Sequence, residues 1–199
     1  VESGNINMHV TGQENIPTEG GFLLYSNHQG LFDVVAVVAA CETPISAVYK
    51  KEIENIPFIR EIATCLKGLA MDRKDPRQSL QVIQEVTKEV MEGRRYLIFP
   101  EGTRTVDFNQ IKFRHGFASI ALNCNCDIRP VVFKFDGVAL RKGKLFYHTY
   151  HKILTYRIEV LDKIDIHEFI KNNPGHERTA LPRILSKALQ KTIQSKMEN

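Results

Sequence analysis

The sequence predicts an α/β fold: a single domain with a mostly parallel central sheet flanked by helices. Short apolar runs alternate with segments of helical periodicity through residue 133, which is the pattern of strand–helix–strand units. The chain has 199 residues, of which 43% are hydrophobic, and this is enough for one well-buried core. Because no repeat, low-complexity tract or linker divides it, we expect one domain over residues 1–199.

Strands are predicted where short apolar runs are bounded by turn-forming residues. In chain order they are Asn5–Val10, Gly21–Tyr25, Ile45–Tyr49, Gly68–Met71, Arg95–Phe99, Ile128–Phe133, Lys144–Thr149 and Arg157–Leu161. We expect the later strands to add an antiparallel edge to the parallel sheet.

Helices are predicted where apolar residues recur at helical spacing. In chain order they are Leu31–Cys41, Pro57–Leu66, Arg77–Glu92, Gly116–Asn123, Ile166–Lys171 and Arg178–Lys196. Arg77–Glu92 has the clearest pattern, because its apolar residues form one stripe and Gly93 follows at a favourable stopping position.

Composition narrows the classes of partner. The net charge of +4 is too small to indicate nucleic acid binding, but it suits anionic substrates or a lipid surface. No apolar run is long enough to cross a bilayer and no signal peptide is visible. Since the chain begins at Val1 rather than at methionine, an anchor in a preceding N-terminal segment stays open. The four cysteines lack the paired spacing of a zinc site, so we expect free thiols and no metal.

Polar clusters follow three of the predicted strands. They are Asn27-His28, Asp72-Arg73 and the run from Glu101 to Arg104. Ligands of parallel sheets bind beyond the carboxyl ends of the strands, so the three clusters predict one shared site.

His28 and Asp33 are the candidate catalytic pair. If a helix opens near Gly30, Asp33 can fold back and hold one ring nitrogen of His28, which leaves the other nitrogen to take a proton. The alternative is an exposed loop histidine next to a carboxylate that the helix dipole stabilises.

The run from Phe99 to Arg104 suits a phosphate group. Gly102 lets the backbone approach a ligand closely, while Thr103 and Arg104 offer a hydroxyl and a bidentate guanidinium. The alternative is a surface turn with a weak pair of Glu101 and Arg104. Arg73 adds a second cation, unless it forms a local ion pair with Asp72 or Asp75.

Together these blocks resemble those of the glycerolipid acyltransferases, the family of 1-acylglycerol-3-phosphate acyltransferases. Asn27, His28 and Asp33 resemble its Asn-His-x4-Asp block, and residues 99–104 match its Phe-Pro-Glu-Gly-Thr-Arg block without a difference. Residues 68–73 are similar to its Gly-x3-Asp-Arg block, and residues 128–131 to its final block. In residues 113–116, Arg114 replaces the lysine of the usual Phe-Lys-x-Gly. The blocks lie in the family's order within residues 27–132.

The resemblance implies a role for each of these residues. His28 is the general base that deprotonates the acceptor hydroxyl, and Asp33 orients its ring. Arg73 and Arg104 hold the acceptor phosphate, while Glu101, Gly102 and Thr103 shape the acceptor site. Arg114 keeps the charge of the usual lysine with a different reach, and Pro130 supports the acyl-donor side. No metal, cofactor or acyl-enzyme is required.

The expected reaction moves a fatty acyl group from acyl-coenzyme A or acyl carrier protein to 1-acylglycerol-3-phosphate, giving phosphatidic acid. Glycerol-3-phosphate or another lysophospholipid is the alternative acceptor. Two other classes stay open: a non-catalytic lipid-phosphate binding module, which would not need the His28–Asp33 pair, and a thioester hydrolase in which His28 activates water.

Two segments are candidates for membrane contact. Lys50–Lys67 mixes basic and apolar residues, and the last predicted helix is basic and amphipathic. For the last helix we favour packing of the apolar face on the sheet. We expect the protein at the cytoplasmic face of a membrane, peripheral or anchored by a segment outside this chain.

Overall fold

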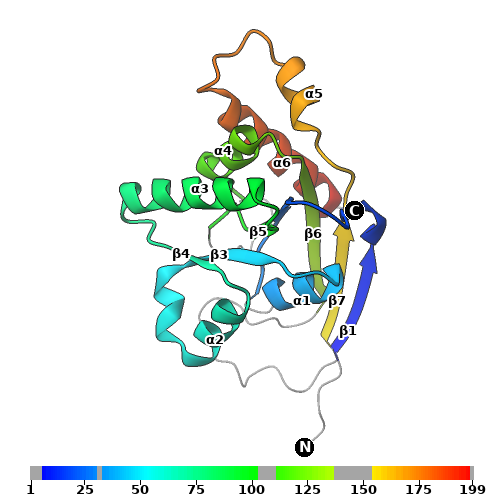
Figure 1. Cartoon of the computed structure of the whole chain (residues 1–199). Coiled ribbons are helices and arrows are strands. Elements are labelled where there is room, and N and C mark those ends of the chain that lie inside the picture. The colour runs from blue at the N-terminus through cyan, green and yellow to red at the C-terminus, as the bar shows by residue number, and fades with distance from the viewer. Residues whose placement is uncertain (1–5, 31–32, 103–110, 137–153, 198–199) are drawn as a thin grey trace, which may run out of the picture.

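The computed structural model describes residues 6–30, 33–102, 111–136 and 154–197 (Figure 1). Within these ranges seven strands form one sheet in the order β1-β7-β6-β2-β5-β3-β4. Their bounds are β1 Ile6–Thr11, β2 Leu23–Ser26, β3 Ser46–Lys50, β4 Leu69–Met71, β5 Tyr96–Ile98, β6 Ile128–Asp136 and β7 Leu154–Val160. The predicted strand Lys144–Thr149 lies outside the described residues.

The five strands from β6 to β4 pair in parallel, which confirms the mostly parallel sheet. β7 runs antiparallel to β6, as expected of a late strand. It is not the edge, however, because β1 pairs with its other side. The backbone groups on that side of β7 are paired with β1 from Leu154 to Glu159, so β1 forms the edge instead.

The helices agree with the predicted segments to within a few residues. They are α1 Asp33–Cys41, α2 Pro57–Cys65, α3 Pro76–Met91, α4 His115–Cys124, α5 Ile166–Lys171 and α6 Leu181–Met197, with short 3₁₀ turns η1 Gln13–Asn15 and η2 Lys51–Asn55. Asp75 caps α3 by accepting the backbone N–H groups of Arg77 and Gln78. The last helix, α6, begins at Leu181, three residues after the predicted start at Arg178. Pro182 suits the first turn of the helix.

Two apolar clusters lie on opposite faces of the sheet. On one face α3, α4 and α6 pack on alternate side chains of β2 and β5, among them Leu23, Tyr25 and Ile98. On the other face α1 packs on the intervening side chains, such as Leu24 and Leu97. In Figure 1 the strands accordingly separate α1 from the group of α3, α4 and α6. The last helix therefore packs its apolar face on the sheet, as favoured.

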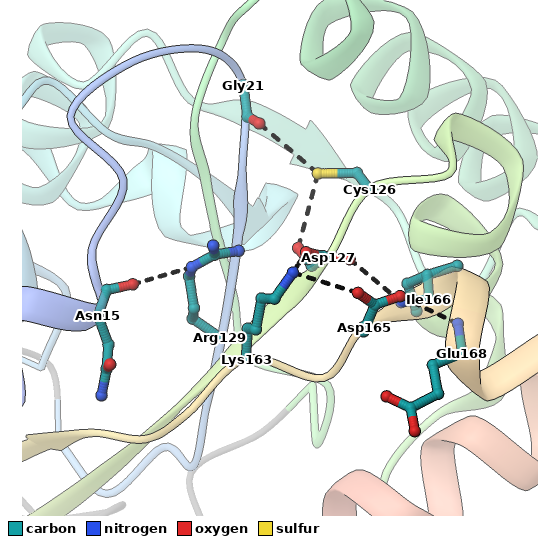
Figure 2. A network of polar contacts seen from close by, with 9 residues as sticks. All are labelled: Asn15, Gly21, Cys126, Asp127, Arg129, Lys163, Asp165, Ile166 and Glu168. Carbon is teal, nitrogen blue, oxygen red and sulfur yellow. Dashed lines mark hydrogen bonds and ion pairs between the residues drawn. The ribbon is translucent and has the colours of Figure 1, made fainter.

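A polar network fixes the amino end of β6 (Figure 2). Asp127 accepts the backbone N–H of Ile166 at 3.1 Å with one carboxylate oxygen and pairs with Lys163 at 2.8 Å with the other. Arg129 donates to the carbonyl of Asn15 at 2.9 Å. These contacts tie the start of β6 to α5 and to the first turn of the chain. The candidate site lies at the other end of the parallel strands, where their carboxyl ends come together.

No helix among the described residues is both long and apolar enough to cross a membrane.

Candidate active site

His28 lies two residues after Ser26, the last residue of β2, and the intervening Asn27 fixes the chain there. The Asn27 amide donates to the carbonyl of Phe133 and accepts from its N–H, both at 2.8 Å. These two bonds extend the pairing of β2 with β6 one residue beyond its last backbone pair, Ser26 with Val131. Ser26 is buried and its hydroxyl donates to the carbonyl of Asn27, which is a structural role. His28 therefore emerges from a fixed strand end.

Asp33, the first residue of α1, holds the imidazole of His28. Its Oδ2 atom lies 2.9 Å from His28 Nδ1 and also accepts the backbone N–H groups of Gln29, at 2.6 Å, and Gly30, at 2.8 Å. Asp33 is 1% exposed, whereas the His28 side chain is 19% exposed. A carboxylate at Nδ1 favours the tautomer with its proton there, so Nε2 carries the lone pair. The exposed-loop alternative for His28 is excluded.

Two residues that follow β5, Phe99 and Glu101, also contact His28. The imidazole stacks on the ring of Phe99, with centroids 4.3 Å apart and planes 27° apart. The buried carboxylate of Glu101 accepts the backbone N–H of His28 at 2.9 Å. The polar clusters after β2 and β5 are thus joined directly, as adjacent parallel strands predict.

Arg73 and Arg114 meet at Gly102. Gly102 has a φ of +70°, and a Cβ built on it would lie 3.0 Å from Arg73 Nη1 and 3.1 Å from Arg114 Nε. A side chain at this position would be strained and would displace both guanidinium groups. The cluster after β4 therefore reaches the same site through the side chain of Arg73.

The two cations Arg73 and Arg114 lie side by side at Gly102. Within the described ranges, neither guanidinium forms an ion pair, and the buried Arg73 Nε has no hydrogen-bond partner. Burial, and next the charge of Arg114, lower the pKa of Arg73, while Glu52 acts in the opposite direction. Two neighbouring cations that repel each other, one of them partly desolvated, favour the binding of an anion between them. The predicted alternative, a local pair of Arg73 with Asp72 or Asp75, is not among the ion pairs of the described residues; the two carboxylates instead accept backbone N–H groups of Lys74 and Arg77.

Thr103 and Arg104 lie outside the described residues, so their predicted roles stay predictions. Pro130 sits within β6, opposite Tyr25 of β2, and its predicted part on the donor side is likewise untested. In the described part of the chain, no group of three or more His, Cys, Asp or Glu residues could hold a metal ion.

Residues 7–134 match the family model described as Acyltransferase, which is more than half of the chain. The chain belongs to the acyltransferase family. The chain is 27% identical to a 1-acyl-sn-glycerol-3-phosphate acyltransferase of Limnanthes alba over 186 residues, 87% of this chain and 66% of that protein. It is 33% identical to the enzyme of that name from Pseudomonas aeruginosa over 127 residues, 63% of this chain and 49% of that protein.

The fold agrees with a solved structure, the 1-acyl-sn-glycerophosphate acyltransferase PlsC of Thermotoga maritima. The TM-score is 0.70 at 20% identity, over 98% of this chain and 73% of the solved chain. This likeness concerns the fold. The chain spans between about half and two thirds of the length of the two curated relatives above.

Sequence reasoning gave no separate role to Asn27 or Phe99, although both belong to recognised blocks. Tyr156 on β7 was missed altogether: burial, and next the charge of Asp33, raise its pKa to about 12. No local pattern links residue 156 to residue 33, because only the antiparallel pairing of β7 with β6 brings them near.

Proposed function

We propose that this acyltransferase moves a fatty acyl group from an acyl thioester to the free hydroxyl of 1-acylglycerol-3-phosphate, giving phosphatidic acid. One observation carries the proposal. An oriented imidazole, His28 on Asp33, shares one end of the sheet with two neighbouring arginines, the partly buried Arg73 and the exposed Arg114, through the bonded pair of His28 and Glu101. A hydroxyl to be deprotonated and a phosphate to be held are the two features of that acceptor. The names of the relatives support the same substrate.

His28 Nε2 takes the proton of the acceptor hydroxyl as its oxygen attacks the thioester carbonyl. The bond to sulfur breaks as the tetrahedral intermediate collapses, and the imidazolium returns its proton to the departing thiolate. Asp33 holds the ring and stabilises the imidazolium, as the carboxylate of a catalytic triad does. The products are an ester and a free thiol, so the step balances without an acyl-enzyme, a metal or a cofactor.

Arg73 and Arg114 would grip the phosphate of the acceptor from two sides of Gly102. The absence of a Cβ at Gly102 leaves both guanidinium groups within reach of one anion. Arg104 and Thr103, which follow directly in the same block, are proposed to add to this grip, and Glu101 to hold the loop against His28. Since two cations match a phosphomonoester best, we favour 1-acylglycerol-3-phosphate over acceptors with larger headgroups.

The acceptor is a lipid, so the proposal includes contact with a membrane surface at its cytoplasmic face. Either acyl-coenzyme A or acyl carrier protein would serve as donor. The basic and apolar segment Lys50–Lys67, which contains η2 and α2, is the proposed contact.

The test is release of thiol from acyl-coenzyme A in mixed micelles, with product analysis by mass spectrometry. Thiol release that depends on 1-acylglycerol-3-phosphate and yields phosphatidic acid would establish the proposal. Equal release without acceptor, yielding free fatty acid, would instead indicate a hydrolase. Binding of the acceptor without turnover, by either acyl-coenzyme A or acyl carrier protein, would indicate a lipid-phosphate binding module.

A further inference from the structure

Among the described residues, no hydrogen bond or ion pair holds the side chain of Arg73. Its Nε is buried without a partner, and its nearest charged neighbour at Gly102 is another cation, Arg114. Repulsion between the two guanidinium groups favours movement of Arg73 out of the site whenever no anion is bound. The placement of Arg73 must therefore come from the backbone that carries it.

That backbone is the end of β4, a short strand at one edge of the described sheet. β4 has three residues, lies at the edge, and pairs with β3 alone. Its other side presents backbone N–H and C=O groups that none of the seven described strands engages. Arg73 lies two residues after Met71, the last residue of β4. Movement of the end of β4 would therefore move the guanidinium group of Arg73.

Gln78, in the first turns of α3, occupies the open side of β4. Its Oε1 accepts the N–H of Asp72 at 2.8 Å, and its Nε2 donates to the carbonyl of Ala70 at 2.9 Å. The N–H and C=O of residues two apart are the pair of groups that a neighbouring strand would engage. The side-chain amide of Gln78 thus takes the place of one peptide of a missing strand.

Other bonds complete the turn without reaching the strand itself. Asp72 Oδ1 accepts the N–H of Lys74 at 2.9 Å, and the hydroxyl of Ser79 donates to the carbonyl of Asp72 at 3.0 Å. Gln78 differs from these residues because it bonds on both sides of Met71, one bond to the strand and one to the turn.

We propose that Gln78 is a positioning residue for phosphate recognition: its amide locks the end of β4 and thereby holds Arg73 against Gly102 and Arg114. This inference rests on the proposed function, in which Arg73 holds the acceptor phosphate. Gln78 lies outside every motif block, and its effect on the reaction passes through Arg73 alone.

The test uses Gln78→Met, which keeps the length of the side chain and removes both bonds. We expect the KM for 1-acylglycerol-3-phosphate to rise about tenfold, the equivalent of roughly one hydrogen bond to a charged group. The KM for the acyl donor and kcat should stay within about twofold of the parent values. Gln78→Glu keeps the acceptor for Asp72 and loses the donor to Ala70, so it should fall between the parent and Gln78→Met.

Thr87→Val is the matched control. Thr87 is half-buried on the same helix, and its hydroxyl donates only to the carbonyl of Ile83, at 2.8 Å, away from the site. Its variant should lose a comparable bond without any change in the acceptor KM. Thermal unfolding of each variant verifies that it is folded. A rise of the acceptor KM in Thr87→Val equal to that in Gln78→Met would overturn the positioning role.

A double-mutant cycle with Arg73→Ala separates the two proposals. If Gln78 acts through Arg73, adding Gln78→Met to Arg73→Ala should raise the acceptor KM no further. Additive effects would overturn the inference. A raised KM in Arg73→Ala with an unchanged KM in Gln78→Met would refute the positioning role alone. An unchanged KM in Arg73→Ala would refute the phosphate role on which it rests.

Discussion

Asp33 Oδ2 lies 2.9 Å from His28 Nδ1, and the same oxygen accepts two backbone N–H groups from the turn between the two residues. One atom therefore fixes both the path of the chain and the orientation of the ring. The His28–Asp33 pair is built into the turn before α1, which explains why five positions of sequence suffice to form it.

Replacing Asp33 by Asn should reduce kcat about 10³-fold to 10⁴-fold, as loss of the carboxylate does in catalytic triads. The amide oxygen can still accept from Gln29 and Gly30, so the turn should persist while the imidazolium loses its counter-charge. Steady-state kinetics and thermal unfolding measure the two effects. A kcat within about tenfold of the parent would remove Asp33 from the mechanism.

Gly102→Ala should raise the acceptor KM, because the new Cβ would press on Arg73 and Arg114 at 3.0 and 3.1 Å. Gly20→Ala is its control, since Gly20 has a similar φ of +73° but no atom within 4 Å of the added Cβ. Both variants should lose about 1 kcal/mol of stability from backbone strain. If Gly20→Ala and Gly102→Ala have the same acceptor KM, crowding of the arginines is not the cause.

Arg114→Ala should raise the acceptor KM about tenfold to a hundredfold, the range for a charged hydrogen bond to phosphate. Arg114→Lys keeps the charge without the bidentate fork and should recover part of that loss. Arg77→Ala, which removes an exposed arginine from the first turn of α3, controls for net charge. An effect of Arg114→Ala on the donor KM alone would transfer Arg114 to the other substrate.

The raised pKa of Tyr156 predicts that the free energy of unfolding falls at alkaline pH. Its pKa is raised from 10.0 to about 12, by burial and next by Asp33, so the folded state keeps a proton that the unfolded chain releases. Stability is then unaffected below about pH 10 and falls as pH rises toward 12. Tyr156→Phe should reduce this slope by about 1 kcal/mol per pH unit between about pH 10 and 11. Urea unfolding between about pH 10 and 11 measures it, and an unchanged slope would contradict the shift.

Much of this architecture follows from local patterns in the sequence. Strand–helix alternation predicts the parallel strands, and the polar residues after β2, β4 and β5 predict a shared edge. The position of β7 inside the sheet could not be predicted, because its parallel pairing with β1 joins residues more than a hundred positions apart, such as Ile6 and Leu154.

The candidate site shows the same division. The His28–Asp33 pair is local and could be predicted from its spacing. The meeting of Arg73 with Arg114 at Gly102 could not, since it depends on the depth to which each side chain reaches across the sheet edge. Gln78 carries no motif at all: its role appears only when the open side of β4 is known.

The central claim is tested most directly by acceptor-dependent thiol release in His28→Ala, measured beside the parent protein and His9→Ala. His9 is an exposed histidine on β1, and its replacement should leave the rate unchanged. We predict that His28→Ala stays folded and loses turnover with 1-acylglycerol-3-phosphate. Turnover by His28→Ala at the parent rate would contradict the mechanism.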